Sequence, residues 1–224
     1  MTKHKLIMIY SGIAFLLFFS QFGVQEIMAL SFIRSLSDTG YFIVWLLLTL
    51  LQGVGAIGLL YLMGESRVFC RFEWKFSYLG ATVGTVILMY LWWNLAALFL
   101  PLPQNQARGE LLFQDLSGTA FFIQFVLNIS LFGPICEELV YRALLMTSLK
   151  SFQEYYLDVL LSSVLFSLMH VLPHGWSFSS FIIYLGGGLL FAALYRKTKS
   201  IYYPIMLHIA WNSFVTLLQL TMMR

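Results

Sequence analysis

Seven polar side chains that lie within or at the edge of apolar stretches are the residues most able to do chemistry. They are Asn128, Glu137, Glu138, Arg142, His170, His208 and Asn212. An ionisable group in the membrane interior costs about 2.5–3.5 kcal/mol, so five such groups require either mutual pairing or a function. Carboxylates, imidazoles and carboxamides can activate a water molecule and stabilise an oxyanion. The set is therefore typical of a hydrolytic site, although pairing between helices or an ion path would also explain it.

The segment Pro134–Arg142 carries two adjacent glutamates. On a helix, Glu138 and Arg142 are four residues apart and share one face, so we expect a carboxylate–guanidinium pair. Glu137 projects about 100° away from Glu138 and is free for another task. Pro134 removes a backbone donor and predicts a break or bend just before the carboxylates. Such a bend would open a polar pocket.

Two further pairs at the same spacing follow along the chain. Phe166 and His170 are four residues apart, and so are His208 and Asn212. For amide hydrolysis, Glu137 would act as general base, His170 would hold the water, and His208 and Asn212 would donate hydrogen bonds to the oxyanion. Alternatively, Glu137, His170 and His208 would bind zinc and acidify its water. The residues themselves do not decide between these two mechanisms.

The composition indicates which elements position these residues. Of the 224 residues, 60% are hydrophobic and 10% are charged, whereas a soluble domain has about 25% charged residues. This excludes an ordinary cytosolic enzyme and a disordered chain. A net charge of +3 is too small for a nucleic-acid reader. The apolar surface that this composition implies is therefore expected to face a lipid bilayer.

Seven apolar stretches are long enough to cross a bilayer, since a spanning helix needs about 20 apolar residues. We therefore expect an all-α polytopic bundle of about seven transmembrane helices, with six to eight compatible with the pattern. The first stretch lacks a small-residue cleavage site and is interpreted as a membrane helix rather than a signal peptide. The stretches are approximately Leu6–Gly23, Gly40–Met63, Ser77–Leu100, Thr119–Leu149, Glu154–Val171, Phe178–Tyr195 and Ile201–Leu220.

The basic residues predict the orientation, because Lys and Arg are enriched in cytoplasmic loops. With a cytoplasmic N-terminus, the other side holds three basic residues, Arg34, Arg108 and Arg224. The cytoplasmic side then holds nine: Lys3, Lys5, Arg67, Arg71, Lys75, Lys150, Arg196, Lys197 and Lys199. We therefore predict an odd number of spans with the N-terminus in the cytoplasm.

The connectors are short and no internal repeat is visible, so residues 1–224 are expected to form one integral membrane domain. The loop from Pro101 to Gly118 contains helix breakers. It separates a scaffold, residues 1–100, from a catalytic half, residues 119–220. No functional site is predicted in the scaffold half.

The three motifs resemble those of the CAAX protease and bacteriocin-processing family, the glutamate-type intramembrane proteases that include type II CAAX prenyl endopeptidases. The family pattern has two glutamates with an arginine four residues after the second, then an aromatic residue four before a histidine, then a histidine four before an asparagine. The match runs from about Pro134 to Asn212. It departs only at Tyr141, where phenylalanine is common.

The resemblance implies a multi-pass cell-membrane endopeptidase that cleaves a membrane-associated peptide or protein. Expected roles are CAAX-type processing, pheromone or bacteriocin processing, and self-immunity. It implies Glu137 as base, Glu138 and Arg142 as a supporting pair, and His170, His208 and Asn212 as the rest of the site. The family has been called metalloproteases, but we expect no obligatory metal.

Two other functions are compatible with the sequence. One is a catalytically silent adaptor that binds a membrane partner such as a sensor kinase. The other is a proton-coupled transporter, since Glu, His and Arg also build proton relays. The transporter is disfavoured because the chain shows no inverted repeated halves.

Overall fold

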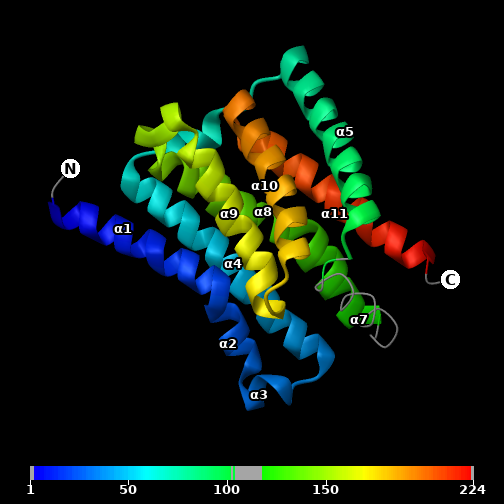
Figure 1. Ribbon diagram of the computed structural model, residues 1–224. Helices are drawn as coiled ribbons and strands as arrows, with labels where there is room; N and C mark the ends of the chain where they lie inside the picture. Colours follow the sequence, from blue (N-terminus) through cyan, green and yellow to red (C-terminus); the bar gives the residue numbers. More distant parts are fainter. Residues whose placement is uncertain (1–2, 102, 104–117, 223–224) are drawn as a thin grey trace.

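The computed structural model describes residues 3–101, 103 and 118–222, and all regular structure in these ranges is helical (Figure 1). Most of the predicted Pro101–Gly118 linker, together with Arg108 and Arg224, lies outside the described residues. The long helices are α4 (Asp38–Met63), α5 (Phe76–Phe99), α9 (Leu157–Val171), α10 (Phe178–Thr198) and α11 (Tyr202–Met222). The expectation of an all-α bundle is confirmed.

Six helices in the described residues are long and apolar enough to cross a membrane. They are His4–Ala29, Asp38–Met63, Phe76–Phe99, Gly118–Met146, Leu157–His174 and Phe178–Thr198. The seventh predicted stretch forms α11, a helix of 21 residues. It is not among these six helices, and it carries the polar side chains of His208 and Asn212.

The first span is interrupted by a π-helical segment. α1 (Lys3–Phe18) leads into η1 (Phe19–Gly23) and then α2 (Val24–Ala29), and the short α3 (Ser31–Arg34) follows. The wider turn of η1 places Ser20 and Gln21 in the interior, where both contact the Tyr141 hydroxyl at 2.8 and 3.2 Å. The first span is therefore tied to the glutamate-bearing helix by polar contacts.

The glutamate-bearing span changes its helical winding several times without a break. α7 (Gly118–Phe121) continues as the π-helix η3 (Phe122–Phe132), then α8 (Gly133–Glu138), then the π-helix η4 (Leu139–Met146). Pro134, which has no N–H, stands where the bonding pattern changes from i−5 to i−4. The span is therefore not broken at Pro134, because a change of winding absorbs the missing donor, and the bend that the sequence offered as the other outcome stays a prediction.

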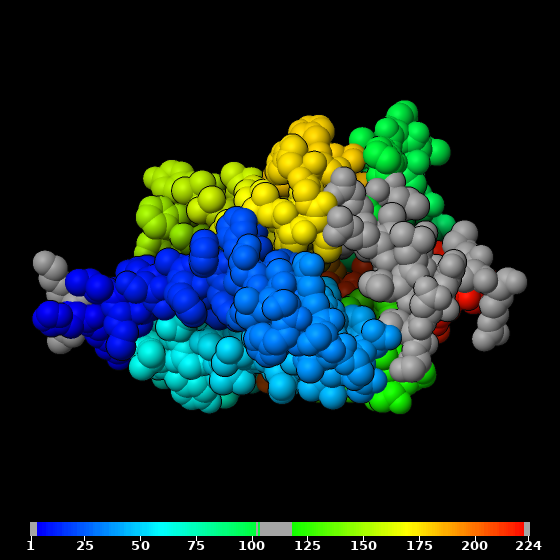
Figure 2. Space-filling view, turned by 90° about the horizontal axis from the view of Figure 1, so that it is seen from below, coloured from blue at the N-terminus to red at the C-terminus, as the bar shows by residue number. Residues whose placement is uncertain are grey.

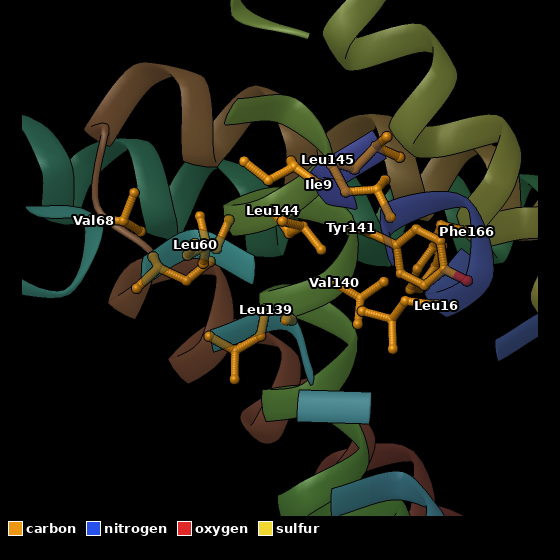
Figure 3. Close-up of a cluster of buried hydrophobic side chains, with 14 residues drawn as sticks. Ile9, Leu16, Leu60, Val68, Leu139, Val140, Tyr141, Leu144, Leu145 and Phe166 are labelled. Atoms are coloured by element: carbon orange, nitrogen blue, oxygen red, sulfur yellow. The ribbon is translucent and has the colours of Figure 1, made fainter. Parts of the chain in front are cut away.

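The core surrounds η4, whose eight residues are all buried. Leu139, Leu144 and Leu145 pack with Leu60 of α4 and Ile9 of α1 in one cluster, which Figure 3 shows around the η4 ribbon. The same cluster contains Phe166 of α9 and Val68 of η2 (Ser66–Cys70). Side chains that face outward from the bundle are apolar as well, for example Leu98 and Phe99 at 75% and 78% exposure. A bilayer covers such a surface.

The remaining short helices are η5 (Lys150–Tyr155), which precedes α9, and η6 (Leu172–His174), which follows it. η5 and η2 lie at the same end of the bundle, because Lys150 pairs with Glu65 at 4.0 Å. η6 lies at the other end, in contact with η1. One end of the bundle therefore carries η2 and η5, and the opposite end carries η6.

Candidate active site

Glu138 and Arg142 form the predicted ion pair in the core. Arg142 Nε lies 3.3 Å from Glu138 Oε2, and both side chains are fully buried. Arg142 Nη2 also donates to the backbone oxygen of Gly188 at 3.2 Å. The guanidinium carbon lies 4.3 Å from the Phe166 ring centre and 5.5 Å from that of Phe191. Pairing, one hydrogen bond and aromatic contact offset part of the cost of burying this charge, although Glu138 Oε2 and the Nε and Nη1 atoms of Arg142 have no hydrogen-bond partner among the described residues.

The second carboxylate oxygen of Glu138 contacts His208 of α11. Glu138 Oε1 lies 2.9 Å from His208 Nδ1. A carboxylate paired with arginine only accepts hydrogen bonds, so Nδ1 carries the hydrogen. The imidazole also stacks on Phe191, with the ring centres 4.5 Å apart. His208 is thereby fixed with Nε2 directed at Glu137.

Glu137 lies between the two histidines. Its Oε2 is 3.7 Å from His208 Nε2 and 3.9 Å from His170 Nε2. Both separations exceed a direct hydrogen bond and suit groups that share a water or a reacting group between them. Glu137 Oε2 is buried and has no hydrogen-bond partner among the described residues. The structure therefore brings all three predicted residues to one point.

His170 is oriented by its own helix. Its Nδ1 lies 3.0 Å from the backbone oxygen of Phe166, and because a carbonyl oxygen only accepts, Nδ1 carries the hydrogen. In the neutral ring, Nε2 then presents its lone pair to Glu137. The ring stacks on Tyr184 of α10 at 4.3 Å between centres. Helical spacing and an aromatic partner thus fix both the tautomer and the direction of this ring.

Asn212 lines the same cavity one turn beyond His208. Its Nδ2 donates to the backbone oxygen of Ile129 at 3.0 Å, which uses one of its two N–H groups. Asn128 also lines the cavity, and its Nδ2 donates to Gln124 Oε1 at 3.2 Å. The two carboxamides therefore bring polar groups from α11 and η3 to the cavity wall.

The residues stand in a cavity of about 490 Å³. Its walls include side chains of the first half of the chain, where no functional residue was predicted. Those first-half residues are Ser20, Val24, Gln25, Tyr41, Trp45, Thr49, Gln52, Met89, Trp92 and Trp93. Residues of the first half therefore contribute to the cavity wall, and the division into a scaffold half and a catalytic half stays a prediction. The sequence contained one signal for this contribution, namely polar residues inside apolar runs, such as Gln52 and Thr49.

The fit of a metal ion can be judged from the same distances. Zinc binds nitrogen and oxygen at about 2.0–2.2 Å, so two tetrahedral ligands lie about 3.4 Å apart. The Glu137 oxygen lies 3.7 and 3.9 Å from the two Nε2 atoms. In the described part of the chain, no group of three or more His, Cys, Asp or Glu side chains is placed to hold a metal. The geometry thus does not support the zinc alternative.

The segment that carries this site is similar to a known protein family. Residues 119–214 match the model of the family described as Rce1-like type II CAAX prenyl endopeptidase. The matched segment contains all six predicted site residues and covers less than half of the chain. The comparison therefore shows that this segment is similar to that family, in a chain with six helices that are long and apolar enough to cross a membrane.

Two curated bacterial proteins are similar over the same part of the chain. The putative membrane peptidase YdiL of Bacillus subtilis is 35% identical over 96 residues, which are 42% of this chain and 37% of YdiL. The membrane-embedded CAAX protease MroQ of Staphylococcus aureus is 29% identical over 102 residues, 43% of this chain and 39% of MroQ. The match thus spans less than half the length of either relative. No solved structure matches the chain at a significant level.

Proposed function

We propose that this chain is an intramembrane endopeptidase in which Glu137 activates water to hydrolyse a peptide bond. The single observation that carries the proposal is the position of Glu137, with its carboxylate 3.7 and 3.9 Å from two imidazole nitrogens at the wall of a cavity. A carboxylate oxygen that is buried and has no hydrogen-bond partner among the described residues is poorly explained by helix pairing alone. A water held between these groups would satisfy all of them.

The proposed reaction uses each group in the state that its contacts favour. The water donates one hydrogen to Glu137 and the other to the lone pair on His170 Nε2. Glu137 takes the proton as the water oxygen attacks the carbonyl carbon, and it then passes this proton to the leaving amine nitrogen. The C–N bond breaks, and a carboxylic acid and an amine are released.

The tetrahedral oxyanion needs donors, and two groups are proposed for this role. Asn212 offers its second N–H. His208 donates from Nε2 only as an imidazolium, because its Nδ1 hydrogen is directed at Glu138. The Glu138 carboxylate, 2.9 Å away, would stabilise that cation. Glu138 and Arg142 are thus proposed to act through His208 rather than on the substrate.

The proposed substrate is a membrane-associated peptide or protein segment, and the proposed location is the cell membrane. The two relatives are named a membrane peptidase and a CAAX protease, which supports peptide-bond cleavage. CAAX-type processing, and pheromone or bacteriocin processing with self-immunity, are the roles proposed from the family. No metal is assigned a step.

The test is mass spectrometry of the membrane peptide pool from cells that carry wild type or Glu137→Gln. The expected result is one or more cleaved peptides that appear with wild type and not with the variant. Glu154→Gln is the matched control, because it removes an exposed carboxylate in η5 and should leave the products unchanged.

The same two strains also test the alternative that the protein is a catalytically silent adaptor. An adaptor that binds a signalling partner keeps its phenotype when Glu137 becomes Gln, because the fold is unchanged. An unchanged peptide pool together with an unchanged phenotype would refute the protease proposal.

A further inference from the structure

The cavity reaches only one end of the bundle. Towards the basic loops, its lining stops at Gln52 in α4, Met89 in α5, Phe191 in α10 and His208 in α11. Beyond this level the buried cluster around η4, described above, fills the interior. Glu137 therefore lies at the inner end of the cavity.

The other end of the cavity is formed by residues close to the opposite loops. They include Gln25 of α2, Tyr41 of α4, His174 of η6 and Gln219 near the end of α11. Figure 2 views this end and shows a hollow between the segments near residues 25–45 and 170–180, with parts of the green and red segments visible inside. The route to Glu137 thus runs from the end that carries η6 and α3.

The closed end of the bundle carries the positive charge. Its loops are joined by Tyr202 Oη to the Phe69 oxygen at 2.7 Å, and by Arg196 Nη2 to the Gln153 oxygen at 2.7 Å. Seven basic residues lie there: Arg67, Arg71, Lys75, Lys150, Arg196, Lys197 and Lys199. Among the described residues, the connectors at the cavity end hold Arg34. By the positive-inside rule, the closed end is cytoplasmic.

The chemistry of the walls limits what enters. Tyr41, Trp45, Trp92, Trp93 and Trp211 line the cavity. Among the described lining residues, Glu137 is the only carboxylate, and no lysine or arginine is present. A charged substrate side chain would meet no opposite charge in such a space except the Glu137 carboxylate, so its desolvation would be poorly compensated, whereas apolar and aromatic side chains would pack against the aromatic walls.

We propose that the peptide substrate reaches Glu137 from the extracytoplasmic side of the membrane. Its segment next to the cleaved bond is uncharged and apolar or aromatic. The assignment of cleavage to Glu137 rests on the proposed function, but the side of access rests only on the cavity and the charge distribution. A peptide already exported, or a segment exposed at the outer leaflet, is therefore the substrate class.

Access can be measured with a membrane-impermeant maleimide on intact cells and on inside-out vesicles. Cys70 is a natural exposed thiol at the closed end, whereas the other free cysteine, Cys136, lines the cavity, so the Cys136→Ala variant reports the closed end. Gln25→Cys in a Cys70→Ser, Cys136→Ala background reports the cavity end. Gln219→Cys in the same background is the second reporter, in case Gln25→Cys fails to fold.

The expected result is that Cys70 reacts only in inside-out vesicles, whereas Gln25→Cys and Gln219→Cys react in intact cells. Reaction of the cavity reporters only in inside-out vesicles would overturn the proposal, as would reaction of both ends from one side. Labelling does not require catalysis. A wrong side of access is therefore distinguishable from an absence of protease activity.

The substrate preference is tested on the products. If the peptides that depend on Glu137 are identified, the residues flanking their cleaved bonds should be apolar or aromatic. Flanking lysine, arginine, aspartate or glutamate in most products would contradict the proposed wall chemistry, even if the side of access were correct.

Discussion

The buried Glu138–Arg142 pair gives the sharpest test of how the site is held together. Replacement of Arg142 by Met keeps most of the side-chain volume but leaves Glu138 as a charge with no exposed surface. Breaking a buried pair by removing one partner costs about 3–5 kcal/mol. The variant also loses the bond to Gly188 and the contact with the Phe166 ring. We therefore expect Arg142→Met to lower the free energy of unfolding by at least 3 kcal/mol.

A second substitution separates the stranded charge from the lost packing. Glu138→Gln removes the charge but keeps a side-chain oxygen near His208 Nδ1. The double variant Arg142→Met, Glu138→Gln leaves no unpaired charge in the core. It should therefore be more stable than Arg142→Met alone, with a coupling energy of about 0.5–3 kcal/mol between the two sites.

The assay is unfolding of the detergent-solubilised protein, followed by size-exclusion profiles after heating and by denaturant titration. Arg34→Met is the control, because Arg34 is exposed and its loss should change stability by less than about 0.5 kcal/mol. The reasoning fails if Arg142→Met is as stable as Arg34→Met. It also fails if Glu138→Gln destabilises the Arg142→Met protein further.

Three other predictions concern the site and its supports. Glu137→Gln and His170→Ala should each abolish cleavage, measured as product peptides, while the unfolding temperature stays near that of wild type. Tyr141→Phe should lower stability by about 1–2 kcal/mol in the same unfolding assay, because the hydroxyl loses its two partners in η1. Gly53→Val should destabilise the protein by about 1–3 kcal/mol, since a Cβ there would lie 2.6 Å from a sulfur of α8. Gly58→Val, with no atom within 4 Å of its Cβ position, is the matched control, and equal effects of the two would contradict the packing argument.

The sequence predicted the parts of the site that depend on local periodicity. The spacing of Glu138 and Arg142 on one helical face was sufficient to predict their ion pair, which the structure confirms at 3.3 Å. The direction of Glu137 away from that pair also followed from the helical rotation of about 100° per residue. The catalytic roles stay predictions, because they depend on a substrate.

Features that depend on tertiary packing could not be predicted. Trp92 and Trp93 lie in a largely apolar run, so no periodicity showed that both would line the cavity. The contact of Glu138 with His208 joins residues 70 positions apart. That contact fixes the histidine tautomer, and a motif spacing contains no information about it.

The second glutamate links the fold to the proposed chemistry. Its two oxygens contact different partners, Arg142 on one side and His208 on the other. An apolar residue at position 138 would leave Arg142 uncompensated in the core and would remove the acceptor that holds Nδ1 of His208. The same Glu138 carboxylate that pairs with Arg142 therefore also directs His208 Nε2 towards Glu137. Glu138 thus both stabilises the buried arginine and orients His208. Because Glu138 is occupied by these two contacts, the proposed chemistry needs a second carboxylate, which Glu137 supplies.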